Sequence, residues 1–297
     1  MKSTRSRDVA FESMRPKLFG IAYRMLRTRA EAEDVVQDAW LRLTRTPEVT
    51  SIEGFLVRTV TRLCLDHEKS ARARRERYVG PWLPEPLLSV SPDEGDVVRL
   101  ESINIALLHV LGLLSPLERA VFLLREVFDY SYDEVSEIVL RRPDACRQIA
   151  KRARDRVQGE GGWGSVDPVE HEQLLGAFLG AARDGDVGTL ESLLTGDVVL
   201  LADGGGKVIS ATKPISGPNK VARFMVGVSS KATDDTTLTF ERLNGLPGAV
   251  IRIEGRIAVI FLLQVLGGKI RRVFAVRNPD KLQNVDETAE HPGKLFG

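Results

Sequence analysis

The chain has little of several features that would point to a particular chemistry or compartment. Its 297 residues include two cysteines and four histidines, which is too few for a disulfide framework and offers no metal-ligand spacing. No apolar run reaches the roughly 20 residues that span a bilayer, and the longest, Ile257–Leu266, is short enough to be a strand. The first residues contain no apolar signal-peptide core. We therefore expect a cytoplasmic protein with no membrane segment, no metal and no cofactor.

The chain also has almost no net charge, but its basic residues are unevenly spread. The formal charge is +1, whereas Arg58–Arg77 holds seven basic and three acidic residues, a net +4, and Arg141–Gln158 holds seven and two, a net +5. Two compact basic windows in a neutral chain predict two separate contacts with a polyanion. Two solvated helix faces are the alternative from charge alone.

The first 77 residues have the three- and four-residue spacing of apolar side chains that is typical of amphipathic helices. One helix is expected to reach Leu26. A second begins near Arg29 and ends before Thr46-Pro47, and a third begins near Ile52 and continues into the first basic window.

Prolines and glycines then interrupt the helical pattern over Tyr78–Asp96, which predicts an extended linker. The linker contains WLPEP (Trp82–Pro86), so a Trp and a Leu lie on a stiff segment. A passive tether whose Trp packs on the nearest surface is the alternative.

Helices resume from Val97 to Gln158. A short helix ends at Val139, a break covers Leu140–Pro143, and a basic helix follows from Asp144 to Val157. Two short helices with a tight turn and a basic second helix fit a helix-turn-helix, although an ordinary surface helix has the same pattern. Cys146 lies on this helix, where neighbouring basic side chains could acidify its thiol, but we interpret it as a packing residue.

After a glycine-rich linker the pattern changes to two helices, two strands, one helix and four strands. The first two strands are expected at residues 198–202 and 208–211, on either side of DGGGK (Asp203–Lys207). This order predicts a curved antiparallel sheet with helices on one face.

Long segments resemble a known family. LFGIAYRMLRTRAEAEDVVQDAWLRL (18–43) and GFLVRTVTRLCLDHEKSARARRE (54–76) resemble region 2 of bacterial extracytoplasmic-function (ECF) sigma factors, and residues 114–157 resemble region 4. The remainder resembles a SnoaL-like, NTF2-like α+β cone. WLPEP, DGGGK and NPDKL (Asn278–Leu282) together resemble the subgroup that carries this cone as a fused C-terminal domain.

The resemblance implies a multidomain fold with two all-α sigma domains and an α+β cone. The expected divisions are region 2 (8–77), a linker with WLPEP (78–96), region 4 (97–158), a Gly-rich linker (159–166), the SnoaL-like domain (167–277) and a tail with NPDKL (278–297).

The implied function is that of a sigma factor, which binds core RNA polymerase and directs promoter-specific initiation. The implied partners are the β′ clamp helices and the β flap of the polymerase and promoter DNA. Polymerase docking falls on Asp34, Gln37, Asp38 and Trp40. Recognition of the −10 element falls on Arg62, Asp66, His67, Lys69, Ser70, Arg72, Arg74 and Arg75.

Recognition of the −35 element would use the second helix of the helix-turn-helix. The residues expected to contact base edges are Arg147, Gln148 and Lys151. Those expected to contact phosphates are Arg141, Arg142, Arg152 and Arg154. One departure concerns the turn, where the family usually has glycine and this chain has Leu140.

The fused domain would take the place of a separate anti-sigma factor. We expect WLPEP to pack near DGGGK with NPDKL close by, because exposed Trp82 and Leu83 need an apolar surface and the glycines permit close approach. The regulatory residues would be Trp82, Leu83, Pro84, Glu85, Pro86, Asp203, Gly204, Gly205, Gly206, Lys207, Asn278, Pro279, Asp280, Lys281 and Leu282.

A C-terminal domain that is itself a cyclase-like or isomerase-like enzyme, or a sensor of a small-molecule ligand, is the alternative. Acid–base chemistry in such a cone needs an Asp/His or Asp/Tyr pair, and residues 167–277 contain one histidine, His171, and no tyrosine. We therefore expect no catalytic residues. Four phenylalanines could line an apolar cavity or simply form the core: Phe224, Phe240, Phe261 and Phe274.

Overall fold

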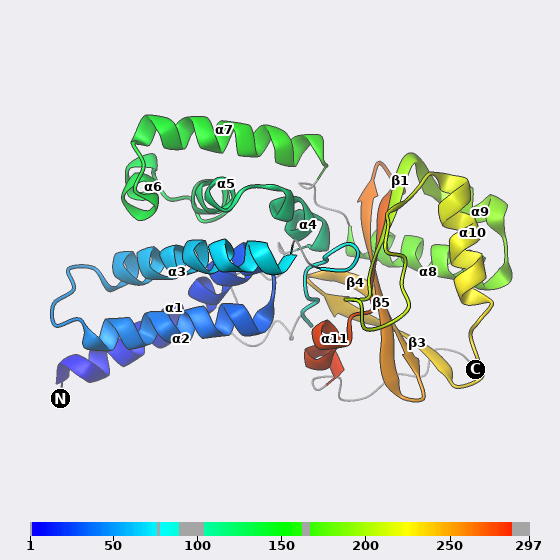
Figure 1. Cartoon of the computed structure of the whole chain (residues 1–297), viewed down its shortest axis with the longest axis horizontal. Coiled ribbons are helices and arrows are strands. Elements are labelled where there is room, and N and C mark those ends of the chain that lie inside the picture. Colours follow the sequence, from blue (N-terminus) through cyan, green and yellow to red (C-terminus); the bar gives the residue numbers. More distant parts are fainter. Residues whose placement is uncertain (1, 76–77, 89–103, 162–166, 287–297) are drawn as a thin grey trace. The chain divides into compact units, whose positions relative to one another are not determined.

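The computed structural model describes residues 2–75, 78–88, 104–161 and 167–286 (Figure 1). The chain forms two compact units. Unit 1 contains residues 1–76, 91–100 and 107–163, and unit 2 contains residues 77–90, 101–106 and 164–297. Much of the chain between the two sigma-like segments therefore belongs to the C-terminal unit.

Unit 1 begins with three helices that pack against one another: α1 (Lys2–Leu26), α2 (Arg29–Arg45) and α3 (Ile52–Arg75). The boundaries of α2 agree with the sequence signals. Thr28 is extended at its N-terminus, and Thr46, just before a proline, is extended at its C-terminus. The apolar stripe of α2 faces inward, with Val35, Ala39 and Leu43 buried.

The second part of unit 1 contains all but the first two residues of α4 (Ile105–Leu113), followed by α5 (Pro116–Phe122), the π-helical turn η2 (Leu123–Val127), α6 (Tyr132–Val139) and α7 (Pro143–Gly159). Ser115 and Ser131 each form a capping box with the glutamate three residues on, which fixes where α5 and α6 begin. The expected helix-turn-helix is thus α6 and α7. The expected helical stretch before α4 lies outside the described residues.

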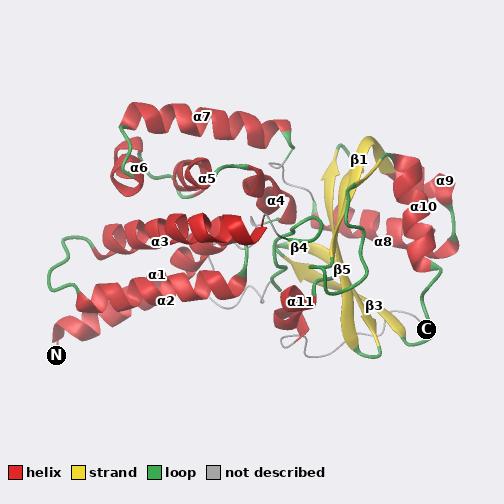
Figure 2. Ribbon diagram, in the orientation of Figure 1, coloured by secondary structure: helices red, strands yellow, loops and turns green. Residues whose placement is uncertain are grey.

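Unit 2 has the expected order of elements (Figure 2). Its helices are α8 (Pro168–Asp184), α9 (Val187–Leu193), α10 (Pro218–Ser229) and α11 (Pro279–Asp286). Its strands are β1 (Leu194–Asp203), β2 (Ile215–Ser216), β3 (Thr236–Leu243), β4 (Leu246–Ile253), β5 (Arg256–Leu266) and β6 (Lys269–Val276), in the sheet order β2-β1-β6-β5-β4-β3. A helical part and an α+β domain are the fold class expected from the sequence, which is confirmed.

Two details of the sheet prediction are wrong. The sheet is mixed rather than antiparallel, because β1 pairs with β6 in parallel; the long intervening chain lets β6 return in the same direction. The strand expected at 208–211 is absent, and the second strand is the short pair Ile215–Ser216. Residues 204–208 instead form a tight turn, with Gly205 and Gly206 at positive φ and the Lys207 amide bonded to the Gly204 carbonyl.

Both faces of the sheet are covered, rather than one. Helices α8, α9 and α10 cover one face over a core that includes Phe178, Leu200 and Phe261. Residues 78–88 and α11 contribute to a second core on the other face, around Leu83 and Phe274 (Figure 1). Phe261 and Phe274 therefore lie on opposite faces, and the four phenylalanines do not line a common cavity. In the described ranges, no helix combines the length and the apolar character needed to cross a membrane.

Candidate functional site

Helix α7 presents a basic outer face and an apolar inner face. Cys146, Ile149, Ala150, Ala153 and Val157 are buried against unit 1. Arg147, Gln148, Lys151 and Arg152 are exposed on this helix, and Arg141 and Arg142 are exposed in the turn just before it. Six of the seven residues predicted to contact the −35 element are thus exposed to solvent.

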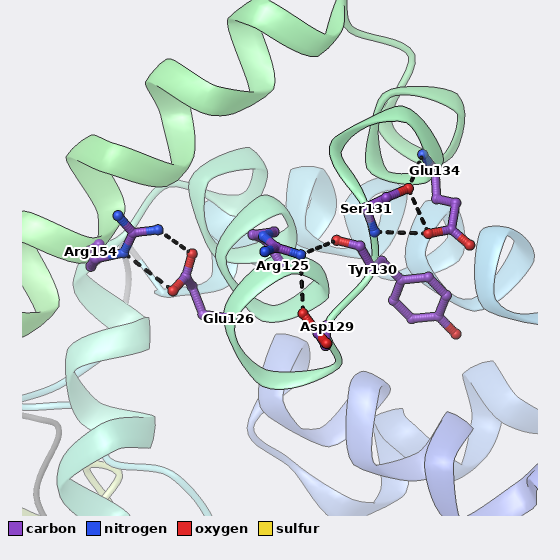
Figure 3. A network of polar contacts seen from close by, with 7 residues as sticks. All are labelled: Arg125, Glu126, Asp129, Tyr130, Ser131, Glu134 and Arg154. Atoms are coloured by element: carbon purple, nitrogen blue, oxygen red, sulfur yellow. Dashed lines mark hydrogen bonds and ion pairs between the residues drawn. The ribbon is translucent and has the colours of Figure 1, made fainter.

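Arg154, the seventh, has a structural partner that sequence reasoning missed. Its guanidinium forms a two-pronged ion pair with Glu126 of η2, with Nη2 2.5 Å from Oε1 and Nε 3.2 Å from Oε2 (Figure 3). Arg125 nearby donates to Asp129 and to the Tyr130 carbonyl. These contacts fix the loop before α6 and hold α7 on η2; a phosphate contact of Arg154 stays a prediction.

The turn between α6 and α7 has a left-handed residue at the position where the resemblance predicts glycine. Leu140 has φ 54° and ψ 52°, a left-handed conformation that L-residues with a Cβ adopt at a cost. Its side chain is 66% exposed, so no apolar contact compensates. The turn nevertheless closes, with the Leu140 and Arg141 amides bonded to the Ser136 carbonyl.

The predicted polymerase-docking residues lie on α2. Asp34, Gln37 and Asp38 are exposed, and Trp40 is half-buried with its ring centroid 4.8 Å from that of Phe11. The aromatic ring is therefore partly a packing residue of the α1–α2 contact, beside an acidic exposed face.

The predicted −10 residues fall on α3. Asp66 and Lys69 pair at 2.8 Å on the exposed side, and His67 lies 3.8 Å from Glu31. Arg62 is turned toward α6 instead, which the sequence did not indicate. The backbone of α3 continues through Arg75, and the side chains of Ser70, Arg72, Arg74 and Arg75 lie outside the described residues.

A buried ion pair joins the two parts of unit 1, and sequence reasoning did not identify it. Arg119 of α5 lies 3.1 Å from Glu68 of α3, and these side chains are only 2% and 4% exposed. The same guanidinium donates to the carbonyls of Leu111, Leu114 and Met25. A buried arginine so widely bonded fixes how α5 sits on α1 and α3.

The three motifs of the C-terminal unit meet at one buried carboxylate. Asp203, at the end of β1, is fully buried and accepts hydrogen bonds from the Tyr78 hydroxyl (2.5 Å), the Leu83 amide (2.8 Å) and the Gly205 amide (3.1 Å). Lys281 of α11 pairs with it at 2.7 Å and is also buried. We call Tyr78, Leu83, Asp203, Asn278 and Lys281 the Asp203 cluster.

The rest of the cluster closes around this ion pair. The Lys281 ammonium also donates to the Leu83 carbonyl and lies 3.8 Å from the centroid of the Trp82 ring. Asn278 donates to the Tyr78 hydroxyl at 2.8 Å. A Cβ on Gly205 would approach the Asn278 side chain within 2.5 Å, so the close approach expected of this glycine is present.

Residues 78–88, here called the connector, are held beyond the cluster as well. The Asn244 amide donates to the Leu87 carbonyl (2.8 Å), and the Leu87 amide donates to the Asn244 side chain (3.2 Å). Leu88 forms an antiparallel bridge with Leu243, and all residues from Leu83 to Leu87 are buried. The packing of WLPEP near DGGGK and NPDKL that the sequence predicted is thus present.

The outer rim of this contact is an exposed ion pair. Lys207 lies 2.6 Å from Asp280, which places the last residue of DGGGK against NPDKL. Asp280 is in the first turn of α11, where the helix dipole favours a carboxylate. NPDKL therefore starts a helix rather than an irregular tail.

Sequence reasoning missed Tyr78 and Asn244. Tyr78 precedes the WLPEP motif and resembles an ordinary linker residue, and Asn244 resembles an ordinary hairpin residue. A positive φ of 51° at Asn244 is the conformation that Asn tolerates in a turn.

An Asp/Tyr pair that the sequence analysis did not anticipate is present in unit 2, where the Tyr78 hydroxyl donates to Asp203, whose carboxylate also pairs with Lys281. Burial lowers the pKa of His171 to about 4, and a contact with the Pro247 backbone offsets only part of this shift. Burial raises the pKa of the Tyr78 hydroxyl, and the bond to Asp203 adds to the shift. No group of His, Cys, Asp and Glu side chains suited to a metal ion occurs in the part of the chain that the structure describes.

The cysteines are packing residues. Cys64 and Cys146 are free and buried. Burial raises the pKa of the Cys146 thiol and outweighs the nearby Arg141, so the acidification suggested by the basic helix does not occur.

Comparison with known proteins shows which family the chain matches. Residues 10–74 match the Sigma-70 region 2 family, and residues 104–157 match the Sigma-70, region 4 family. The chain is 34% identical over 285 residues to the ECF RNA polymerase sigma factor SigJ of Mycobacterium tuberculosis, covering 91% of each protein. It is 31% identical over 280 residues to the probable ECF RNA polymerase sigma factor SigI of the same species, covering 93% of this chain and 94% of the relative. The crystal structure of SigJ superimposes with a TM-score of 0.75 at 33% identity, covering 93% of this chain and 98% of that one.

Proposed function

This chain belongs to the ECF RNA polymerase sigma factors, and we propose that its C-terminal unit sets its activity by holding the connector between the two sigma regions. The observation that carries the proposal is the Asp203 cluster, in which one buried carboxylate binds Tyr78 and Leu83 of the connector. The same carboxylate binds Lys281, which follows the last strand of the C-terminal domain.

The connector is the segment whose freedom decides how far the two regions can separate. Residues 76–104 link α3 to α4 and could extend to roughly 100 Å if the chain were free. Residues 77–90 and 101–106 belong to unit 2, so much of this length is not available as a free tether. Release of the connector would therefore change the effective concentration of one region near the other.

At the promoter, we infer that α7 reads the −35 element through Arg147, Gln148 and Lys151, with Arg141, Arg142 and Arg152 at phosphates. The exposure of Arg147, Gln148, Lys151 and Arg152 on α7, and of Arg141 and Arg142 just before it, supports this assignment. The exposed acidic face of α2, at Asp34, Gln37 and Asp38, is the inferred contact with the polymerase.

We also infer that the C-terminal domain regulates without catalysing a reaction of its own. Asp203, the buried carboxylate of this domain, has its oxygens occupied by three hydrogen-bond donors and Lys281. His171 titrates near pH 4 and is therefore neutral at physiological pH. The domain then does the work of a separate anti-sigma factor; a small-molecule ligand for it stays a prediction.

Run-off transcription with core polymerase tests the regulatory proposal. Trp82→Ala removes the ring that covers Lys281 but leaves the ion pair with Asp203, so we expect promoter-dependent transcription to change several-fold with little change in melting temperature. Arg271→Ala, which removes an ion pair with Asp197 elsewhere in the domain, is the matched control and should leave transcription unchanged. Equal transcription by wild type and Trp82→Ala would contradict the proposal.

A further inference from the structure

The side chain of Tyr132, the first residue of α6, has arginines of two other elements around it. The guanidinium carbon of Arg125 in η2 lies 5.3 Å from the centroid of its ring, and that of Arg147 in α7 lies 5.4 Å from it. The Glu126 carboxylate raises the pKa of Arg154, and a hydrogen bond with the Tyr132 hydroxyl adds to the rise. Tyr132 therefore joins η2 to the helix predicted to read the −35 element.

The position of the Tyr132 ring is fixed by the residues that precede it. Ser131 forms a capping box with the glutamate three residues on, which sets where α6 begins (Figure 3). Arg125 is held in turn, because Nη1 of its guanidinium lies 3.1 Å from the Asp129 carboxylate and 3.1 Å from the Tyr130 carbonyl oxygen. The ring thus rests on a guanidinium that is itself held in place.

Arg147, which is predicted to contact a base edge, is held by two contacts. The Tyr132 ring lies against its guanidinium, and Nη1 of the same guanidinium lies 2.6 Å from a carboxylate oxygen of Asp144. The side chains of Arg147 and Asp144 are 55% and 73% exposed, so the ion pair alone contributes little to stability. A flat ring and a carboxylate together restrict the orientation of the guanidinium while leaving it at the surface.

A restricted guanidinium is an advantage for reading a base. Arginine recognises guanine with two donors at once, so the guanidinium must meet the base edge in one orientation. Ordering a free arginine side chain on binding costs entropy, and a side chain that is ordered beforehand avoids most of that cost. Phosphate contacts carry no sequence information, so the gain at the base increases the preference for the promoter over other DNA.

We propose that Tyr132 and Asp144 are positioning residues for promoter recognition, which hold the Arg147 guanidinium in the orientation that reads its base. The proposal rests on the inferred −35 role of Arg147. Tyr132 supplies a flat surface for the guanidinium, and Asp144 binds Nη1, so Nε and Nη2 are the donors that the base meets. The first helix of the helix-turn-helix thus contributes to sequence preference through the second helix.

Nuclear magnetic resonance of the arginine side chains in the full chain tests the positioning without DNA. An aromatic ring shifts the signals of groups that lie over it, so the Arg147 Nε–H signal, identified by its loss in Arg147→Lys, should be displaced from that of a free arginine. The displacement should persist in Tyr132→Phe, which keeps the ring, and disappear in Tyr132→Ala. A wild-type Arg147 signal at the position of a free arginine would overturn the proposal.

Binding to promoter and scrambled DNA tests the consequence. Tyr132→Ala and Asp144→Asn should each lower the preference for promoter DNA about fivefold or more, which is part of what a base contact supplies, whereas Tyr132→Phe should keep the preference. Asp144→Asn also removes a negative charge, so it should raise the affinity for scrambled DNA while the preference falls. Asp155→Asn removes the same charge from an exposed position of α7 and should leave the preference unchanged. Because Asp144 is exposed, its variant decides the question even if Tyr132→Ala does not fold.

The same variants separate this proposal from the function on which it rests. If Arg147→Ala lowers the preference but Tyr132→Ala and Asp144→Asn do not, Arg147 reads a base without help and only the positioning proposal fails. If Arg147→Ala leaves the preference unchanged, the −35 assignment of Arg147 fails and the positioning proposal fails with it. In the Arg147→Ala background, Asp144→Asn should not lower the preference further, because the side chain that it positions is gone. A further loss in that background would overturn the proposal.

Discussion

Single residues decide how the connector is held, and Asp203 is the clearest example. Its carboxylate is completely buried and has four partners, from the connector, the DGGGK turn and α11. A buried charge of this kind is tolerated only when its hydrogen-bonding capacity is filled. Replacing Asp203 alone, or Lys281 alone, should therefore cost more stability than replacing both residues of the ion pair.

Asp203→Asn should lower the free energy of unfolding of unit 2 by about 3–5 kcal/mol, because it leaves the Lys281 ammonium buried without a counter-charge. Chemical denaturation of the full chain measures this. Lys207→Ala, which breaks an exposed ion pair with Asp280, should cost less than about 1 kcal/mol. Equal losses in the two variants would contradict the assignment of Asp203 as the buried anchor.

His171 makes the stability of unit 2 depend on pH. Its pKa is about 4 in the folded chain, below the value of about 6.5 expected when unfolded. Between these values the unfolded chain binds a proton that the folded chain does not, so acidification favours unfolding. We expect a loss of about 3 kcal/mol between pH 6.5 and pH 4 from this group.

Replacing His171 with Phe isolates this contribution. The variant cannot titrate, so its stability should fall less steeply than that of the wild type over the same pH range, as measured by urea denaturation at a series of pH values. A slope identical to that of the wild type would show that other groups cause the acid sensitivity.

At the scale of elements, the helix-turn-helix has a strained residue in its turn. Leu140 adopts a left-handed conformation with its side chain in solvent. Leu140→Gly should stabilise unit 1 by about 1 kcal/mol, since glycine relieves the strain although it also increases the freedom of the unfolded chain. Thermal unfolding measures the gain. Arg141→Gly, at a position without positive φ, should instead destabilise, and the same sign for both substitutions would argue against strain at Leu140.

Some exposed residues of α7 are expected to contact bases, and others are expected to contact phosphates. Arg147→Ala should weaken promoter binding by about 1–3 kcal/mol while changing binding to scrambled DNA little. Arg152→Ala should weaken both alike and reduce the salt dependence of log K by about one. Binding titrations at several salt concentrations distinguish a base contact from a phosphate contact. An equal loss of affinity for promoter and scrambled DNA in Arg147→Ala would exclude a base contact at that residue.

Most elements could be predicted from the sequence because their signals are local. Apolar periodicity and the proline after Thr46 predicted the boundaries of α2, and local patterns predicted the succession of helices and strands along unit 2, although the second strand was expected at 208–211. The parallel pairing of β1 with β6 could not be predicted, because strand order depends on long-range packing that no local pattern encodes. The contact of the three motifs was predictable from exposed apolar residues and glycines, whereas Tyr78 and Arg62 carry no local sign of the partners they bind.

For the whole molecule, the proposed regulation depends on the connector, which the Asp203 cluster holds in unit 2. Within unit 1, a separate contact joins the two sigma regions, since Arg62 of α3 donates to the Glu137 carbonyl of α6. If holding of the connector and promoter binding were coupled by about 1–3 kcal/mol, as is typical of allosteric proteins, promoter binding would change about 5- to 150-fold.

Amide hydrogen exchange of the connector in the full chain tests the central claim most directly. We predict that the amides of Leu83 and Leu87 exchange slowly in the wild type, because each donates to a buried side chain of unit 2. In Asp203→Asn the connector amides should exchange at least tenfold faster, while those of α7 keep their wild-type rates. Exchange of the wild-type connector at the rate of an unstructured peptide would contradict the claim that the C-terminal domain holds it.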